Sequence, residues 1–232
     1  MHRTKAELEN IGFTIVESIY SDQEIDEILT LLNDKEISGQ FGLREFLSKN
    51  TELQSKIFSK RLIELVKQIA PHCTKSIKSI YFDKPPNSNW IVNWHQDLTI
   101  NLSNRKDADQ YKNWRETKER IVVQPNRELL ESIFTIRIHL DDCTVKNGAL
   151  RVIEKSHLEG TIDIKEWLKS KKGKESICEV DSGGVLIMKP LILHSSRRTE
   201  NKLNRRVIHI EFTDQELPDG LEWKESIEFE TA

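Results

Sequence analysis

The segments WHQDL (residues 94–98) and LILHSS (191–196) are the most informative parts of this sequence. Residues i and i+2 of a strand point to the same side, so His95 and Asp97 can reach one metal ion while Gln96 faces away. His194 offers a second imidazole from another strand. Two imidazoles and one carboxylate can occupy one face of a divalent iron and leave three positions open. These three residues are therefore the predicted metal ligands.

A bare His-x-Asp string is weak evidence, because so short a pattern also arises by chance. A histidine at a strand end and an aspartate in a turn can simply be satisfied by hydrogen bonds. The same three ligands would also suit a hydrolytic zinc enzyme. A non-catalytic jelly-roll protein that binds a metal is a further alternative. The surrounding sequence is therefore needed to distinguish an iron site from these alternatives.

The composition favours one soluble domain over residues 1–232, with 37% hydrophobic and 31% charged residues. The net charge is −3, from 35 basic and 38 acidic residues, so a nucleic acid is not an expected partner. No apolar run is long enough to span a membrane, and the polar N-terminus lacks the apolar core of a signal peptide. Cys73, Cys143 and Cys178 form no CxxC pair. We expect a cytoplasmic protein.

The chain divides into a mostly helical flank, residues 1–75, and a strand-rich core, 76–215. Ser21 and Glu24 have the spacing of a capping box at a helix start, and a second helical pattern covers 52–69. Short β-rich runs, separated by turn residues, occur at 77–83, 90–95, 133–140, 149–153, 177–180, 184–189 and 205–213. This number of short strands predicts a double-stranded β-helix, or jelly roll, with the helical third packed on one sheet.

Residues 101–127 interrupt the strand pattern with a polar, charged and largely aperiodic stretch. Long connections of this kind inside a compact domain are usually functional or mobile. The stretch directly follows the His-x-Asp strand. It is predicted to be a lid loop over the site, and a solvated surface loop is the alternative.

Four segments, in this order, resemble the phytanoyl-CoA dioxygenase-like family of iron and 2-oxoglutarate-dependent oxygenases, from about residue 8 to about residue 214. The segments are GFTIVESIYSDQEIDEI (12–28), YFDKPPNSNWIVNWHQDLTI (81–100), RIHLDDCTVKNGALRVIEKSHLEG (137–160) and GGVLIMKPLILHSSRRTENKLNRRVIHIEF (183–212). The third departs from the family pattern, because Glu154 and Lys155 precede Ser-His where relatives often have Pro-Gly. That difference is expected to alter a turn.

The resemblance implies a jelly roll with Fe(II) in its mouth, 2-oxoglutarate as cosubstrate and O2 as oxidant. It implies hydroxylation of a small molecule, with release of succinate and CO2. His95, Asp97 and His194 match the family's ligands. The cosubstrate-binding positions implied by the resemblance are Arg205 and Ser196 at the far carboxylate of 2-oxoglutarate, Gln96 in the middle of the His-x-Asp, and Ile80 in the wall of its pocket.

The choice between Arg205 and Arg206 remains open on the pattern alone. Arginine suits a carboxylate, because its planar fork of donors binds bidentately and stays protonated in a dry pocket. Family spacing favours Arg205, eleven residues after His194. The apolar companions Ile208 and Ile210 instead suggest that Arg206 faces inward. Either arginine could also form a surface ion pair.

Four further residues are candidates for substrate binding. Trp90 and Trp94 flank the approach to His95, and they are equally typical of a jelly-roll core. Arg137 stands where the long-chain acyl-CoA hydroxylase has a tryptophan. Facing the cavity it would make the pocket too polar for a fatty chain, whereas outside it could pair with an aspartate. Arg44 lies in a segment that can reach the mouth or form a helix surface. The substrate's identity and the oligomeric state do not follow from the sequence.

Overall fold

The computed structural model describes residues 3–35, 37, 42–84, 91–106, 109–170, 172–201, 203–218 and 220–229. Its N-terminal third contains α1 (Arg3–Ile11), β1 (Phe13–Val16), α2 (Asp22–Asp34), β2 (Leu43–Arg44), α3 (Phe46–Lys49), α4 (Thr51–Ile57) and α5 (Lys60–Ile69). The middle contains β3 (Lys75–Lys84), β4 (Val92–His95), β5 (Ile100–Leu102), β6 (Lys112–Glu116), β7 (Ile121–Gln124), α6 (Arg127–Ser132) and β8 (Phe134–His139). The last part contains β9 (Leu150–Ile153), α7 (Ile164–Ser170), β10 (Glu175–Cys178), β11 (Val185–Met188), β12 (His194–Ser196), β13 (Arg205–Phe212) and β14 (Ile227–Glu228), with short 3-10 turns at Val145–Asn147 and Ser156–Glu159.

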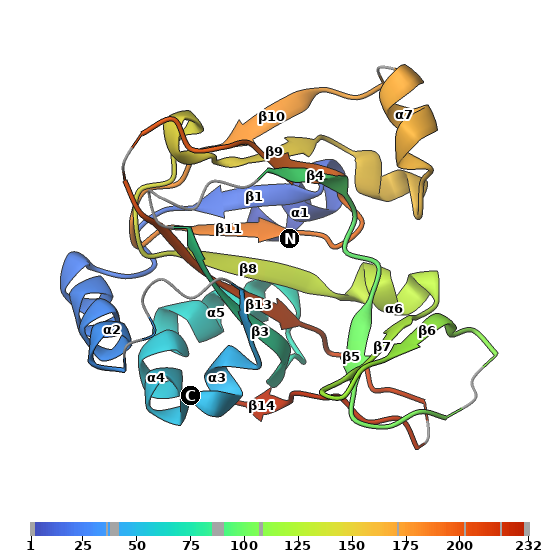
Figure 1. The fold of residues 1–232 in the computed structure, drawn as a ribbon, viewed down its shortest axis with the longest axis horizontal. Helices are drawn as coiled ribbons and strands as arrows, with labels where there is room; N and C mark the ends of the chain where they lie inside the picture. The colour runs from blue at the N-terminus through green and yellow to red at the C-terminus, as the bar shows by residue number, and fades with distance from the viewer. Residues whose placement is uncertain are drawn as a thin grey trace.

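Two antiparallel sheets form the jelly roll, which confirms the predicted fold class (Figure 1). The larger sheet has the order β1-β11-β8-β13-β3-β14, with β2 also paired to β3, and the smaller has the order β10-β9-β12-β4. An apolar cluster joins their facing sides, with Phe13, Leu186 and Met188 from the larger sheet against Leu150 and Val152 from the smaller. The inner face of the larger sheet therefore looks toward the strands that carry both metal-ligand histidines.

The outer face of the larger sheet packs against the N-terminal helices. Figure 1 shows α3, α4 and α5 on the side of this sheet away from β9 and β10. The shared core contains sheet residues Ile136, Ile138, Ile208 and Ile210 and helix residues Leu32, Leu53, Leu62 and Val66, all nearly inaccessible to solvent. Strand β13 is thus apolar on its outer side because that side lies under helices.

Local signals set the helix boundaries. Ser21 and Glu24 form the predicted capping box at the start of α2. The predicted helix over 52–69 is in fact two helices, α4 and α5. The chain breaks at Phe58, and the Ser59 side chain then accepts a hydrogen bond from the Leu62 backbone to start α5. A serine inside a helical apolar pattern was the available sign of this break.

The stretch 101–127 is not an irregular loop, which corrects the prediction for its structure. Strands β5, β7 and β6 form a separate antiparallel sheet. One side is apolar, where Ile100, Leu102 and Val123 pack with Leu129 and neighbouring residues. The register places Asn101, Val122 and Arg115 together on the opposite side. The strands are short and β6 carries a bulge, so alternation is hard to see in the sequence. A role as a lid stays a prediction.

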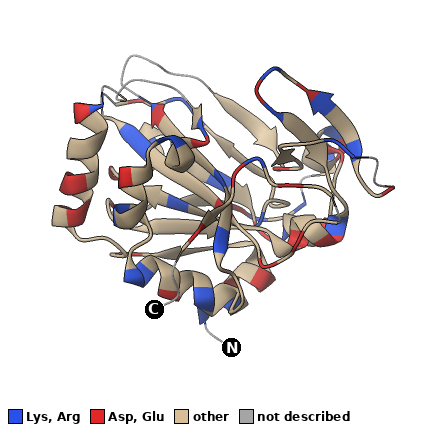
Figure 2. Ribbon diagram, turned by 90° about the horizontal axis from the view of Figure 1, so that it is seen from below, with Lys and Arg blue, Asp and Glu red and all other residues tan. Residues whose placement is uncertain are grey.

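Charged residues of both signs are interspersed along the ribbon (Figure 2). Within the ranges that the structure describes, no helix has the length and apolar character needed to cross a membrane.

Candidate metal centre

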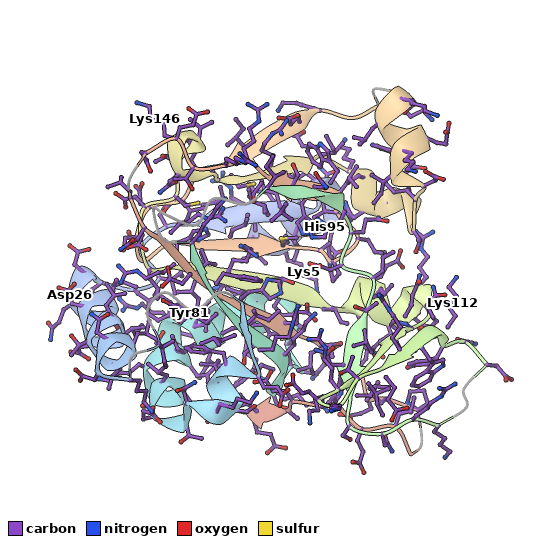
Figure 3. All side chains as sticks on the ribbon, viewed as in Figure 1. Lys5, Asp26, Tyr81, His95, Lys112 and Lys146 are labelled. Atoms are coloured by element: carbon purple, nitrogen blue, oxygen red, sulfur yellow. The ribbon has the colours of Figure 1, made fainter. Side chains whose placement is uncertain are left out.

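The pairing of β4 with β12 brings the two predicted histidine ligands together. His194 lies directly opposite His95 in the register, and their ring centroids are 4.1 Å apart. Asp97 follows β4, and its backbone N–H donates to the Pro190 carbonyl at 2.9 Å. This bond ties the chain after β4 to the segment before β12. Figure 3 shows His95 between the two sheets.

The imidazoles are oriented for metal binding by their own backbones. His95 Nδ1 donates to the Asn93 carbonyl at 2.8 Å, and His194 Nδ1 donates to the Ile192 carbonyl at 2.9 Å. A carbonyl oxygen can only accept, so the proton sits on Nδ1 and leaves the Nε2 lone pair available. This arrangement is typical of metal-binding histidines. Both Nε2 atoms approach the Asp97 carboxylate, from His95 at 3.9 Å and from His194 at 3.6 Å.

The protonation states suit a divalent cation. Burial lowers the pKa of His194 to about 4, so the ring is neutral at pH 7. Burial raises the pKa of Asp97, but the imidazole of His194 and the ammonium of Lys78 outweigh it and hold that pKa well below its ordinary value. Metal ligands must be deprotonated, and His194 and Asp97 are both in that state at pH 7.

The donor set fits a ferrous ion. The ligand atoms of His95, Asp97 and His194 all lie within 4.8 Å of one another. Adjacent ligands of a metal bound at about 2.1 Å are roughly 3 Å apart, so small side-chain rotations close the site. The ligands come from one side only, from two neighbouring strands and the residue after one of them, so the remaining positions face the inner side of the larger sheet.

Asp97, His209 and Glu211 form a second group whose ligand atoms also lie within 4.8 Å of one another. Glu211 already pairs with Lys78 at 2.7 Å, and His209 Nδ1 lies 3.1 Å from the Arg137 guanidinium. These cations oppose a second metal ion in the same place. The group therefore borders the metal centre and positions Lys78 and Arg137 beside it.

The register of the larger sheet separates Arg205 from Arg206. Directly paired residues share a face, and the pairs of β13 with β3 put Arg205, Val207 and His209 on the inner face. Arg206 lies on the other face, where its guanidinium binds the Asp141 carboxylate at 2.6 and 2.9 Å. Of the two arginines, only Arg205 faces the space beside the metal centre.

Arg205 and Arg137 are cations without an acidic partner. Neither forms an ion pair with any carboxylate in the part of the chain that the structure describes, although Arg205 is 7% exposed. An Arg205 nitrogen donates to the Gly148 carbonyl. Burial and the charge of Arg205 lower the pKa of Arg137 to about 10. A buried guanidinium (Arg205) and a half-buried one (Arg137) on the same face of the larger sheet favour the binding of an anion there.

Gly148 is required by the backbone that supports Arg205. Its φ is +81°, and a Cβ would lie 2.7 Å from the Arg197 carbonyl oxygen. That same carbonyl accepts a hydrogen bond from Lys84 Nζ at 2.9 Å. Burial and the charge of Arg205 lower the pKa of Lys84 to about 8. Lys84 was not predicted from the sequence, although it lies directly opposite Arg205 in the register.

Ser196 and Ile80, two other predicted cosubstrate contacts, are both buried. Ser196 is two residues beyond His194 and buried, and its hydroxyl has no hydrogen-bond partner among the described residues. Ile80 is buried and pairs with His209 on the inner face. An unsatisfied buried hydroxyl two residues from His194 is consistent with a ligand contact.

Gln96 does not point toward a cosubstrate, which corrects that prediction. Its amide nitrogen donates to the carbonyls of Gly160 and Leu191 at 2.7 and 2.6 Å, and its oxygen accepts from the Ile162 N–H at 3.1 Å. The strand alternation already placed it opposite the ligands. Gln96 therefore clamps two neighbouring loops against the metal-bearing strand.

Trp94 is also on the opposite face of β4 from His95, so its predicted contact with substrate is not supported. The Arg151 guanidinium lies over its ring at 5.1 Å, on the outer side of the smaller sheet. Trp90 lies outside the described residues. Arg137 faces inward, 5.5 Å above the Phe82 ring, and not toward an aspartate on the outside. Arg44 is on strand β2, opposite Ile80, and so on the inner face.

Ser156 is a structural contributor that the sequence reasoning left out. Its buried hydroxyl donates to the Ile153 carbonyl and accepts from the Leu193 N–H at 2.8 Å, just before the ligand His194. The Ser-His pair in the third resembling segment was the available signal. Lys155 before it has a φ of +65°, a backbone that favours the glycine found in relatives.

A family model for phytanoyl-CoA dioxygenase matches residues 8–207. The chain belongs to this family. No curated protein sequence matches it.

Several solved structures share this fold. A carbocyclase dependent on α-ketoglutarate, SnoK from nogalamycin biosynthesis, is 14% identical with a TM-score of 0.70, over 92% of this chain and 84% of that one. HygX from Streptomyces hygroscopicus, bound to nickel and 2-oxoglutarate, is 13% identical with a TM-score of 0.64, over 92% and 86%. EctD from S. alaskensis, in its apoform, is 15% identical with a TM-score of 0.68, over 92% and 76%. At these identities the likeness establishes the shared fold.

Proposed function

We propose that the protein is an Fe(II)- and 2-oxoglutarate-dependent oxygenase that hydroxylates a small molecule. The observation that carries the proposal is the convergence of His95, Asp97 and His194, with both Nε2 atoms turned to one point. Membership of the phytanoyl-CoA dioxygenase family supports it. So does the binding of 2-oxoglutarate with a divalent metal in HygX, which shares the fold.

The three ligands would hold Fe(II), and the bound metal would supply the oxidising chemistry with O2, with decarboxylation of 2-oxoglutarate to succinate and CO2. Arg205 would bind the far carboxylate of 2-oxoglutarate, and the Ser196 hydroxyl would donate to it. Ile80 would form part of the pocket wall. Each of these side chains projects from a rigid strand of the jelly roll, so the cosubstrate would be fixed before reaction.

The protein's own contribution is orientation and exclusion of water. Gln96 and Ser156 bind backbone next to Asp97 and His194, so they hold the ligand strands in register. The apolar cluster between the sheets keeps water from that part of the space between them. No proton transfer by a side chain is needed for hydrogen abstraction from a C–H bond, and the arrangement supplies binding groups instead.

Hydroxylation is the simplest reaction for this arrangement, and proteins with this fold also catalyse other reactions. Relatives with this fold include SnoN, an epimerase, in addition to the carbocyclase SnoK. The reaction depends on which substrate atom lies beside the metal. Product analysis by mass spectrometry would separate hydroxylation, a gain of one oxygen atom, from epimerisation or ring closure.

The deciding experiment is anaerobic titration of the purified protein with Fe(II) and then 2-oxoglutarate. We expect the weak visible absorption band that accompanies chelation of 2-oxoglutarate to Fe(II), followed by succinate formation when O2 is admitted. A hydrolytic zinc enzyme or a silent metal-binding protein would give no succinate. Buried Arg205, which neither alternative needs, already favours the oxygenase. If no band forms with metal bound, the proposal is wrong.

A further inference from the structure

A cationic cavity of about 200 Å³ adjoins the candidate metal centre. Its lining includes Arg44 from β2, Lys78 from β3, and Arg115 and Arg120 from the small sheet and its hairpin. No carboxylate belongs to the described lining. Thr99 and Asn101 add polar atoms that can donate hydrogen bonds. The cavity is large enough for the charged end of a small molecule.

The cavity lies on the metal side of the larger sheet. Lys78 binds Glu211 at 2.7 Å, and Glu211 has an oxygen within 4.8 Å of an Asp97 oxygen. Arg44 is opposite Ile80 in the register, in the same inner-face row as His209. Asp97 is also only two residues before Thr99. A molecule in this cavity would therefore extend toward the open positions of the metal.

Three guanidiniums in this cavity have no acidic partner. Arg44, Arg115 and Arg120 form no ion pair with any carboxylate within the described ranges. Desolvation and the charge of Arg120 both lower the pKa of Arg44, so the two cations are close enough to repel. Like charges gathered around an empty space are destabilising by themselves, and an anion between them removes the repulsion.

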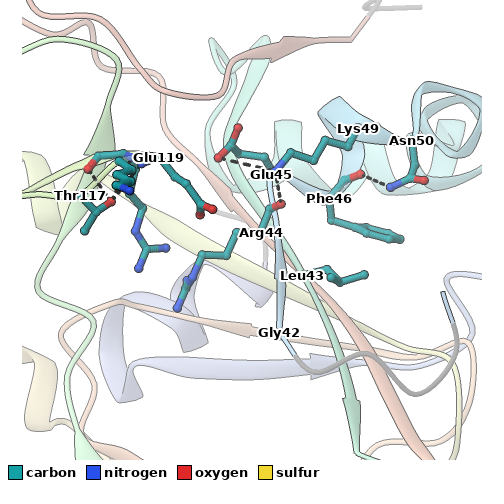
Figure 4. Close-up of a pocket in the computed structure, with 11 residues that line it drawn as sticks. Gly42, Leu43, Arg44, Glu45, Phe46, Lys49, Asn50, Thr117 and Glu119 are labelled. Atoms are coloured by element: carbon teal, nitrogen blue, oxygen red, sulfur yellow. Dashed lines mark hydrogen bonds and ion pairs between the residues drawn. The ribbon is translucent and has the colours of Figure 1, made fainter.

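A wider hollow of about 580 Å³ leads to the same arginines from outside. Figure 4 shows Arg44 between Thr117 and Glu119 on one side and the segment bearing Phe46 on the other. The acidic Glu45 in this hollow already approaches Lys49 and Lys224, each at 4.0 Å. The hollow thus provides a path, and the unpaired positive charge lies at its inner wall, which Arg44 and Arg120 share with the smaller cavity.

This cavity is separate from the place assigned to 2-oxoglutarate. Arg205 is four residues from His209 along β13, a distance of about 13 Å at about 3.3 Å per residue. Arg44, by contrast, is in the same row as His209. The two groups of arginines therefore lie at different positions along the sheet.

We propose that the acceptor substrate carries an anionic group, a carboxylate or a phosphate, that Arg44, Arg115 and Arg120 bind while the carbon to be oxidised reaches the metal. The inference rests on the proposed function and names its substrate class. A guanidinium pairs with either group through two parallel N–H donors. Arg115 reaches the cavity because β6 pairs with β7 so that it shares a face with Val122 and Asn101.

The test uses the protein loaded anaerobically with Fe(II) and 2-oxoglutarate, titrated by calorimetry with benzoate, phenyl phosphate and benzamide. The three probes share a ring and differ in charge. We expect at least one anion to bind tenfold or more tightly than neutral benzamide, and the tighter anion identifies the group. Arg115→Gln and Arg120→Gln should each weaken that binding at least fivefold.

Lys112→Gln is the matched control. It removes one positive charge from the same strand as Arg115, but Lys112 is exposed and points away from the body of the protein (Figure 3). It should bind the anion as the parent does. Equal binding of benzamide, or unchanged anion binding in both arginine variants, would overturn the inference. A normal 2-oxoglutarate band with no anion binding would overturn the inference about the substrate and leave the proposed function standing. A missing band would overturn the proposed function.

Discussion

Replacement of Arg205 by alanine should weaken 2-oxoglutarate binding without unfolding the protein. Arg205 is 7% exposed, faces the inner side of the larger sheet and has no carboxylate partner in the described part of the chain. A hydrogen bond to a charged group contributes about 1.5–3 kcal/mol. Since about 1.4 kcal/mol is tenfold, the concentration of 2-oxoglutarate needed for half-saturation should rise roughly tenfold to a hundredfold.

Arg206 provides a matched control one residue away. Its guanidinium binds Asp141 on the opposite face of β13, so Arg206→Ala should lower the free energy of unfolding by about 1–2 kcal/mol and leave 2-oxoglutarate affinity unchanged. The assay is anaerobic titration of each Fe(II)-loaded variant, followed through the visible band. Arg205→Lys should give an intermediate affinity, because lysine keeps the positive charge but cannot bind a carboxylate through two parallel N–H donors. An unchanged affinity in Arg205→Ala together with a loss in Arg206→Ala would refute the assignment.

Four other predictions test the ligands and their supports. Asp97→Ala should abolish Fe(II) binding by calorimetry and succinate formation while the circular dichroism spectrum stays the same; retained succinate formation would remove Asp97 from the ligand set. Gln96→Leu should lower the free energy of unfolding by about 2–4 kcal/mol in urea, because three backbone groups lose their partner, and a change under 1 kcal/mol would contradict the clamp. Lys155→Gly should raise the free energy of unfolding by about 0.5–1 kcal/mol, since Lys155 has a φ of +65°, and a lower value would show that the lysine is not strained. Burial and the charge of Arg137 lower the pKa of His139 to about 3, so as the pH falls below about 6.5 the unfolded chain binds a proton at this residue before the folded protein does. The metal-free protein should therefore lose stability as the pH falls from about 6.5 toward 3. Urea denaturation at pH 7, 6 and 5 should show a smaller loss of stability in His139→Gln than in the parent protein.

The strand parity of His95 and Asp97 was readable from the sequence, because alternation along a strand needs no tertiary information. The same rule places Gln96 on the far side, as the sequence indicates, and it places Trp94 there too. Their proximity in sequence to His95 suggested a site role, and the structure shows Trp94 against Arg151 and Gln96 bound to backbone. Neighbours of a ligand along a strand are therefore weaker candidates than residues paired to it across the sheet.

The choice between Arg205 and Arg206 could not be made from apolar pattern, because both faces of β13 are buried. Ile208 and Ile210 pack under the helices, while Val207 and His209 face the metal side. A strand buried on both faces has no polar side to reveal its orientation. Spacing from His194 favoured Arg205, and the pairing of β13 with β3 shows that Arg205 is the one on the inner face.

The residues that sequence reasoning missed come from elements remote in the chain. Lys84 lies beside Arg205 through the pairing of β3 with β13. Arg115 and Arg120 line the cationic cavity because the small sheet and its hairpin bring them there. A polar stretch such as 101–127 reads as solvated, because its apolar residues are few and divided between short strands. One face of those strands is nonetheless packed on a core, and this fixes where the charges of the other face point.

The charge distribution of the inner face links the metal, the cosubstrate and the proposed substrate. Arg44, Lys78, Lys84, Arg137 and Arg205 share that face, whereas Glu211 is the acidic residue among the paired positions. A ferrous ion held by one carboxylate adds further positive charge, so metal binding to this face alone is opposed by repulsion. A dicarboxylate cosubstrate offsets part of that repulsion and an acidic substrate offsets more. Binding of Fe(II), 2-oxoglutarate and an anionic acceptor should therefore be mutually reinforcing. Within each pair of ligands, thermodynamic linkage requires that each increases the affinity for the other by the same factor.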